Sequence, residues 1–263
     1  MHIYIGTSGF QYKHWNNGVF YPRGVKDRLR FALSRMTAIE INSSFYRIPP
    51  PETVESWTHG LPEGVKLVLK APQSVSHRRR LKRQSEGNVR QGRDLLNYFI
   101  DGVLRIPEIN RGPVLLQLPE SMAIDLTRLE PVLGLFADRG LQVALEVRHA
   151  SWCISDTFAL LERYRATLVA SDWPEFRAPL IPTSQVIYLR RHGPGALYAS
   201  SYDDDALDAD LESVLRLGES WQSLPSVKEC SVDTAYVFFN NDIHGHAPHD
   251  AMRMLALLKE RSP

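Results

Sequence analysis

The chain has 263 residues, and its 31 Lys and Arg nearly balance its 30 Asp and Glu, which gives a formal net charge of +1. With 43% hydrophobic and 23% charged residues, it has the composition of a globular protein and not of a disordered, collagenous or coiled-coil one. The near-neutral charge disfavours a protein whose whole surface binds nucleic acid or membranes. No apolar run approaches the roughly 18 residues that cross a bilayer, and the N-terminus lacks a signal-peptide pattern. We therefore expect a cytoplasmic protein with no membrane partner.

Eight short apolar or β-branched runs, each bounded by turn residues, indicate eight strands. Most of them lack an alternation of apolar and polar residues, as expected where both faces of a strand are covered. The runs are residues 2–6, 37–41, 66–71, 113–118, 141–147, 167–171, 185–190 and 234–239.

Between most of these runs lie stretches with apolar residues three or four positions apart, which is typical of amphipathic helices. The stretches are residues 26–36, 51–60, 88–104, 126–138, 154–165, 206–217 and 248–259. The gap between the sixth and seventh strands lacks one, because Pro174, Pro179 and Pro182 interrupt it. Strand–helix alternation predicts a parallel sheet with right-handed crossovers. Eight units in about 250 residues favour a closed (β/α)₈ barrel of the TIM type, an α/β fold, as a single domain over residues 1–263.

The functional site of such a barrel gathers at the C-terminal ends of its strands. In this sequence Glu40, Lys70, Glu146 and Arg190 stand inside the apolar runs or at their ends. A buried unpaired charge is costly, so these side chains either line a wet cavity or form a structural ion-pair network. We expect Lys70 to lie close enough to Glu40 on the neighbouring strand for an ion pair. Glu146 and Arg148, two residues apart on one strand, should face the same way.

The charged residues at the strand ends predict acid–base chemistry on an anionic group. Candidate catalytic residues are Glu40, Glu146, Asp172 and His192. Lys70, Arg148, Arg190 and His192 together suggest a phosphate or carboxylate on the ligand. The residues expected to bind substrate are Ser8, Tyr12, Asn42, Tyr46, Lys70, Gln117, Arg148, His149, Trp152, Arg190, Asn240 and Asn241. The hypothesis is an enzyme of the hydrolase or lyase type, acting on a small phosphorylated or sugar-like molecule.

Six segments of the sequence resemble the YecE-like family (domain of unknown function family seventy-two). They are IGTSGFQYKHWNNGVFYP (5–22), EINSSFYRIPP (40–50), LLQLPE (115–120), LEVRHASW (145–152), LRRHGP (189–194) and FFNNDIHGHA (238–247). The resemblance runs over nearly the whole chain and keeps the order of the segments. It implies a TIM-type barrel but no activity, because none is established for the family. The sequence departs from the family pattern at Phe10, where Trp is usual, at Ser76, where Thr is usual, and at His246, where an aromatic residue is more typical.

Two further patterns support alternatives. His244, His246 and His249, with Asp242 nearby, have a spacing that suits a divalent metal, although we expect no cofactor and no metal site. With a metal, the protein would be a phosphodiesterase or nuclease. The basic segment 76–84 suggests a non-catalytic binder of nucleic acid, or else a solvated loop balanced by the acidic stretch 203–212. The favoured partner is a small anionic molecule.

The two cysteines are predicted to be free thiols. In a barrel, Cys153 follows the fifth strand at the C-terminal end, whereas Cys230 precedes the eighth strand at the opposite end. A disulfide requires Cα atoms within about 7 Å of each other, which this arrangement does not allow.

Overall fold

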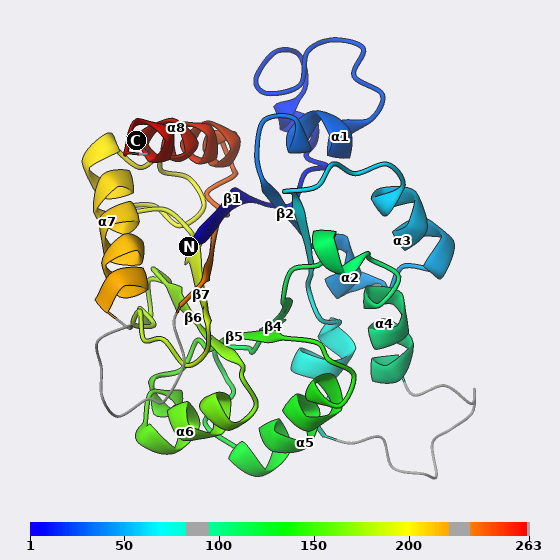
Figure 1. Ribbon diagram of the computed structural model, residues 1–263, viewed down its shortest axis with the longest axis vertical. Helices are drawn as coiled ribbons and strands as arrows, with labels where there is room; N and C mark the ends of the chain where they lie inside the picture. The colour runs from blue at the N-terminus through cyan, green and yellow to red at the C-terminus, as the bar shows by residue number, and fades with distance from the viewer. Residues whose placement is uncertain (83–94, 221–231, 262–263) are drawn as a thin grey trace.

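Eight parallel strands form one sheet that curves into a barrel (Figure 1). The computed structural model describes residues 1–82, 95–220 and 232–261. The strands are β1 (His2–Ser8), β2 (Ala38–Ile41), β3 (Lys66–Leu69), β4 (Val114–Gln117), β5 (Val143–Glu146), β6 (Thr167–Ser171), β7 (Val186–Arg191) and β8 (Thr234–Phe239). Each strand begins and ends within two residues of the first and last residues of a predicted run. The predicted α/β barrel of the TIM type is confirmed.

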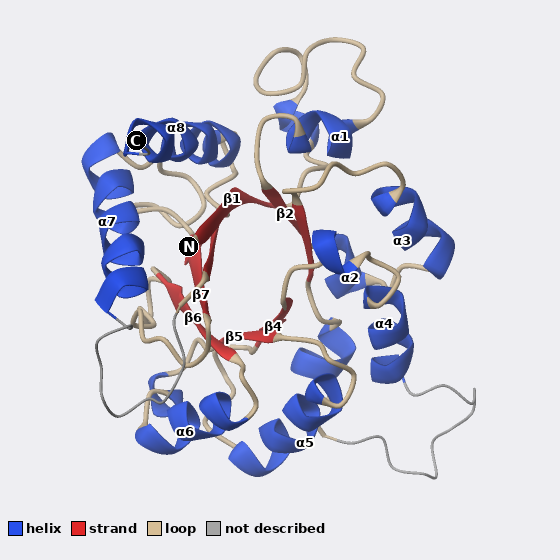
Figure 2. Ribbon diagram, in the orientation of Figure 1, coloured by secondary structure: helices blue, strands red, loops and turns tan. Residues whose placement is uncertain are grey.

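The helices lie outside the strands and surround them (Figure 2). They are α1 (Arg28–Leu33), α2 (Ser43–Tyr46), α3 (Pro51–Thr58), α4 (Leu95–Val103), α5 (Leu126–Ala137), α6 (Ser155–Arg163), α7 (Asp204–Ser220) and α8 (His246–Arg261). All except α2 were predicted, and the predicted first turns of α4, residues 88–94, lie outside the described residues. The segment between β6 and β7 has no helix, as its prolines indicated. Short turns, η1 (Lys13–Trp15), η2 (Ser74–Arg78), η4 (Glu108–Asn110) and η5 (Ala150–Trp152), occupy several of the connections.

The barrel closes at a seam between β3 and β4. Along the sheet the strand order is β3-β2-β1-β8-β7-β6-β5-β4, so β3 and β4 are its two edges. They meet through two isolated parallel bridges, which pair Leu67 with Arg111 and Lys70 with Leu115. The Ala71 N–H donates to the Leu115 carbonyl at 2.8 Å, and the Gly112 N–H donates to the Leu67 carbonyl at 2.9 Å. These bonds join the two edges and complete the ring.

The interior of the barrel changes from apolar to polar along the strands. Side chains alternate along a strand, so every second residue points into the barrel. Toward the N-terminal ends of the strands, which we call the lower part of the barrel, the inner residues form an apolar cluster. Its members are Ala38, Val68, Leu115, Ala144, Val169, Val186, Tyr188, Tyr236 and Phe238. Nearer the C-terminal ends the buried inner residues are polar and include Ser8, Glu40, Gln117, Glu146 and Arg190. The lower part therefore provides an apolar base beneath a polar layer.

No helix of the described residues is long and apolar enough to span a bilayer. Cys153 is an unpaired thiol. Cys230 lies outside the described residues, so the prediction of two free thiols is confirmed for Cys153 alone.

Candidate functional site

A cavity of about 760 Å³ opens at the C-terminal ends of the strands. The predicted binding residues that line it are Tyr12, Asn42, Tyr46, Lys70, Gln117, Arg148, Arg190 and Asn240. They come from β1, β2, β3, β4, β5, β7 and β8 or from the loops that follow these strands. Residues far apart in the sequence thus meet at this end of the barrel, as the fold requires.

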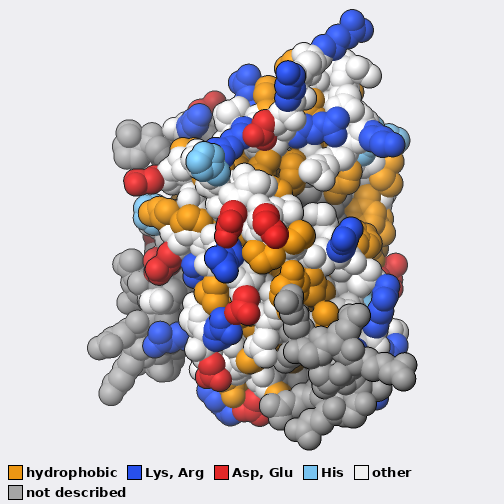
Figure 3. All heavy atoms as spheres, turned by 90° about the vertical axis from the view of Figure 1, so that its right-hand side faces the viewer, with side chains coloured by type: hydrophobic (Ala, Val, Ile, Leu, Met, Phe, Trp, Pro, Cys, Tyr) orange, Lys and Arg blue, Asp and Glu red, His pale blue; other side chains and the backbone are white. Residues whose placement is uncertain are grey.

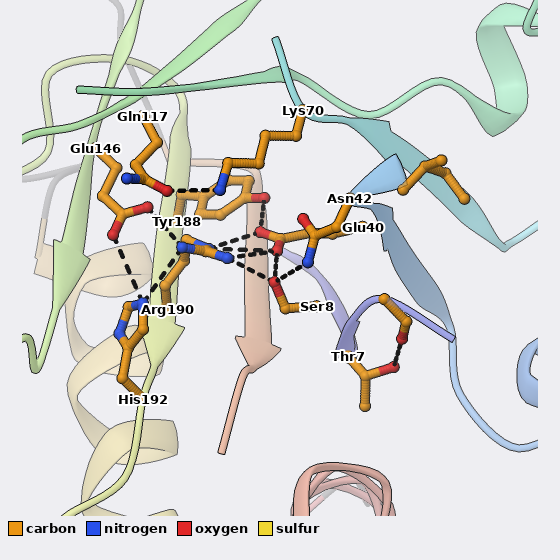
Figure 4. A network of polar contacts seen from close by, with 12 residues as sticks. Thr7, Ser8, Glu40, Asn42, Lys70, Gln117, Glu146, Tyr188, Arg190 and His192 are labelled. Carbon is orange, nitrogen blue, oxygen red and sulfur yellow. Dashed lines mark hydrogen bonds and ion pairs between the residues drawn. The ribbon is translucent and has the colours of Figure 1, made fainter. Parts of the chain in front are cut away.

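Arg190 lies at the centre of the polar layer beneath the cavity and joins two buried glutamates (Figure 4). Its Nε donates to Glu40 Oε1 at 3.0 Å, and its Nη2 donates to Glu40 Oε2 at 2.9 Å. Its Nη1 donates to Glu146 Oε2 at 2.6 Å. The Tyr188 hydroxyl donates to Glu40 Oε1 at 2.6 Å, and the Ser8 hydroxyl donates to Glu40 Oε2. The oxygens of Glu40 are therefore held from three directions.

Glu146 is held by a second arginine as well. Arg148 Nε donates to Glu146 Oε1 at 3.1 Å, which places the two residues on the same side of their strand, as predicted. Burial alone would raise the pKa of Glu146, but Arg190 and Arg148 outweigh it and hold that pKa below the ordinary range of a glutamate. Glu146 is consequently a carboxylate at neutral pH.

His192 connects this layer to Asp172. The His192 backbone N–H donates to Asp172 Oδ1 at 2.7 Å, and its Nδ1 lies 3.3 Å from the same oxygen. The Tyr202 hydroxyl donates to Asp172 Oδ2. Burial lowers the pKa of His192, so the imidazole is neutral at pH 7. Because Arg190 Nη1 lies 3.3 Å from His192 Nε2 and can only donate, Nε2 accepts and the proton is on Nδ1.

Lys70 does not form the predicted ion pair with Glu40. The strand register pairs Glu40 with Val68, so Lys70, which directly follows β3, lies two residues beyond the level of Glu40, at the level of Asn42. Its Nζ donates to Gln117 Oε1 at 2.5 Å and lies 4.3 Å from the centroid of the Phe45 ring. Among the described residues, no carboxylate lies within 4.0 Å of this nitrogen. Burial, reinforced by the charge of Arg190, lowers the pKa of Lys70 to about 7.

His77, which follows β3 in the turn η2, also lines the cavity. Its ring contacts the Phe45 ring edge-on, with centroids 5.0 Å apart, and its Nδ1 lies 2.8 Å from the Ser76 hydroxyl. Burial, together with the charges of Lys70 and Arg148, lowers the pKa of His77 to about 4. His77 is therefore neutral at pH 7.

A carboxyl group with a raised pKa, that of Asp242, lines the cavity near the end of β8. Asp242 accepts from the indole N–H of Trp15, and one of its oxygens lies 3.2 Å from His14 Nε2. Burial raises the pKa of Asp242 to about 6, although His14 opposes the shift. The cavity thus holds two titrating groups near neutrality, Asp242 and Lys70.

The rim of the cavity is partly aromatic. The Tyr46 side chain is 74% exposed there and contacts the Phe45 ring edge-on. The guanidinium of Arg148, which lines the cavity, lies 3.6 Å from the centroid of the buried Trp173 ring, which positions its charge. Aromatic rings and cationic side chains that line one cavity suit a ligand with an anionic group and a planar or apolar part.

Several predicted site residues do not line the cavity. Glu40, Glu146, His192 and Ser8 lie buried in the layer beneath it, together with the partly buried Asp172. Trp152 is buried, and its indole N–H donates to the Met122 carbonyl at 2.8 Å. Asn241 is buried and donates to Asp250 Oδ2 at 2.7 Å. His149 is exposed and accepts from the Ser151 N–H at the start of η5.

The alternatives drawn from charge and histidine spacing gain little support. Within the described residues, no three His, Cys, Asp or Glu side chains lie together as a metal site would require.

In the basic segment, Arg80 donates to Ser121, and residues 83–84 lie outside the described part of the chain. Where the structure describes both segments, no ion pair joins the basic segment to the acidic one. The ion-paired acidic residues of the stretch bind other arginines: Asp204 pairs with Arg253, Asp208 with Arg261, Asp210 with Arg191 and Glu212 with Arg216. On the face seen in Figure 3, Lys and Arg are interspersed with Asp and Glu and with apolar side chains.

Sequence reasoning did not assign a binding role to several cavity residues: His14, Phe45, Gln73, His77, Tyr198 and Asp242. Asp242 was considered only beside the histidines as part of a metal site, although it follows the end of β8 together with Asn240 and Asn241. His77 and Tyr198 come from loops whose course a sequence does not reveal.

Comparison with known proteins agrees with the fold. The chain matches DUF72, a family of proteins of unknown function, over residues 4–263. A DUF72 family protein from Thermotoga maritima MSB8 superimposes with a TM-score of 0.77 and 25% identity, covering 98% of this chain and 100% of that one. A DUF72 family protein from Enterococcus faecalis V583 gives a TM-score of 0.74 at 21% identity, covering 98% and 95%. No curated protein matches. The chain belongs to the DUF72 family.

Proposed function

We propose that the protein is an enzyme of the lyase or hydrolase type that binds a small anionic molecule in the barrel cavity and acts on it by acid–base chemistry. The observation that carries this proposal is Lys70. Its amino group lines the cavity, has no carboxylate within 4.0 Å among the described residues, and has a pKa of about 7. A general acid or base works best when its pKa lies near the working pH.

The ion pairing of the polar layer supports an anionic substrate. The guanidinium groups of Arg190 and Arg148 are matched by the carboxylates of Glu40 and Glu146. A protonated Lys70 has no such ion-pair partner among the described residues, because the carboxylates of Asp172 and Asp242 bond to other groups. A phosphate or carboxylate group would compensate the charge of Lys70 and form charge-assisted hydrogen bonds with the cavity-facing cations.

The proposal moves the acid–base role from the buried glutamates to groups that line the cavity. Lys70 exchanges the proton, and Asp242 is a second acid–base group on the other side of the cavity. Glu40 and Glu146 act as positioning residues, since their oxygens hold Arg190 and Arg148. Two groups with pKa values shifted in opposite directions are a recurring arrangement at catalytic sites.

The test is a screen in which NMR monitors the turnover of small carboxylates and phosphate esters by the protein. Lys70→Met should reduce turnover at least about 100-fold while the protein stays folded, since general acid–base catalysis contributes that much. Lys66→Met is the matched control. Lys66 lies at the other end of β3, where its amine lies over the Tyr4 ring, so this variant should keep full activity. Turnover that survives Lys70→Met, or no turnover of any member of the panel, would contradict the proposal.

A further inference from the structure

The environment of Lys70 suits a nucleophile as well as a base. Its Nζ has an amide oxygen and a ring face as its neighbours, at 2.5 Å and 4.3 Å, instead of a carboxylate. An ion pair would hold the ammonium form, whereas an amide oxygen also accepts a hydrogen bond from the neutral amine. Lysines that act as nucleophiles in proteins are desolvated or lie next to another cation, and both conditions are met here.

The position of the amine within the cavity is defined from two sides. Gln117 on β4 accepts one N–H, and the Phe45 ring from α2 covers another side of the nitrogen (Figure 4 shows Lys70 and Gln117). Lys70 is also paired with Leu115 in a backbone bridge across the seam, which fixes the end of β3. A fixed amine needs little reorganisation to reach a bound electrophile.

The same cavity supplies the groups that would orient the electrophile. Arg148 and Arg190 line the cavity with Lys70, and the ion pairs with Glu146 and Glu40 prevent their guanidinium groups from turning away. An anionic group bound by these arginines would place the rest of a small molecule beside Nζ.

We infer that Lys70 forms an imine with the carbonyl carbon of a small aldehyde or ketone that bears a carboxylate or phosphate group. This inference rests on the proposed function, because it names the substrate class for that cavity. An imine of this kind withdraws electrons from the neighbouring carbon, which makes a bond at that carbon easier to break, as some lyase reactions require.

The step is balanced with a proton from solvent. The lone pair of the neutral Nζ forms the C–N bond while the π electrons of the carbonyl move to its oxygen. The nitrogen then loses one proton, and the oxygen gains two and leaves as water. A C=N bond with one positive charge on nitrogen remains, so one proton is consumed overall. The negative charge of the bound carboxylate or phosphate compensates the iminium.

Sodium borohydride tests the inference, because it reduces an imine to a stable secondary amine. The full chain is incubated with pyruvate or dihydroxyacetone phosphate, treated with borohydride and mapped by peptide mass spectrometry. We expect an adduct on Lys70 that needs the carbonyl compound and is lost in Lys70→Met and Lys70→Arg. The adduct should persist in Lys66→Met. Lys66 is a strict control because burial lowers its pKa too, although it lies at the far end of the strand.

A second measurement separates the two proposals. Binding of the same two compounds is followed by calorimetry without borohydride. If both bind in a Lys70-dependent manner and no adduct forms on Lys70, the imine is overturned and the anion-binding site stands. If neither compound binds nor forms an adduct, the imine is overturned and the proposed function is contradicted for this substrate class. An adduct spread over surface lysines, unchanged in Lys70→Met, also overturns the imine.

Discussion

The guanidinium of Arg190 and the carboxylate of Glu40 form a two-point ion pair inside the barrel, with N–O distances of 3.0 and 2.9 Å. The two residues belong to β7 and β2, which are separated in the sheet by β1 and β8. Both side chains are almost completely buried. The pair therefore connects distant strands directly beneath the cavity.

Removing Arg190 should destabilise the fold strongly. Arg190→Met leaves Glu40 and Glu146 buried with too little positive charge, which typically costs about 3–5 kcal/mol. Urea unfolding at neutral pH measures the loss. The control is Arg261→Met, which breaks a partly exposed ion pair with Asp208 and should cost about 1 kcal/mol or less. Equal losses for the two variants would contradict the structural role of Arg190.

Binding of an anion to the cavity should depend on the charge of Lys70. Because burial lowers the pKa of Lys70 to about 7, the amine is charged below pH 7 and neutral above it. Sulfate is a suitable probe, because its own charge does not change in this range. Its affinity should fall as the pH rises through 7 and the protonated fraction of Lys70 falls, until it reaches the affinity of Lys70→Met. Calorimetry across this range measures the effect, and Lys70→Met should bind weakly at every pH. A wild-type affinity that is the same at pH 6 and pH 9 would refute the prediction.

The titration of His77 should report the charge of Lys70. Burial lowers the pKa of His77 to about 4, and Lys70 is the next cause. Lys70→Met should therefore raise the pKa of His77 toward its ordinary value, which NMR of the ring resonances can follow. Lys66→Met should leave the titration unchanged, because it removes a cation at the opposite end of β3. If His77 has the same pKa in wild type, Lys70→Met and Lys66→Met, the charge of Lys70 does not affect His77 and the prediction is wrong.

Asp242 should reduce stability as the pH rises from about 4 to 6. Burial raises its folded-state pKa to about 6, above the ordinary value of 3.8 for an aspartate. Between these values the unfolded chain loses its proton more readily, so the folded state becomes relatively less stable. Asp242→Asn removes this dependence, and its stability relative to wild type should rise across the window by on the order of 2 kcal/mol. His14→Ala should enlarge the wild-type dependence, because His14 opposes the shift. Parallel stability curves for wild type and Asp242→Asn would disprove this account.

The sequence was sufficient to predict the strands but not the depth of each side chain in the barrel. Apolar runs identify strands because both faces are buried, and the eight runs matched. Strand register depends on tertiary contacts, so the sequence did not reveal that Lys70 lies above Glu40 and level with Asn42. Trp152 follows a strand end, as a cavity residue would, yet its indole turns into the core to bond Met122. Only a folded chain defines such long-range partners.

The seam between β3 and β4 has a consequence for solubility. The edges of a sheet present unpaired backbone groups that readily pair with other chains, and here each edge covers the other. At Gly112, a Cβ would lie 2.6 Å from Val68 Cγ2 and 3.3 Å from the Leu67 carbonyl, so there is no room for a side chain.

Gly112→Val should force the strands apart, expose both edges together and cause aggregation or strand exchange between molecules. Light scattering and size-exclusion chromatography would detect either result. Gly64→Val, at a position with open space around it, controls for a general effect of replacing glycine, although its positive φ of 84° adds local strain. A monomeric Gly112→Val protein would show that the seam tolerates separation.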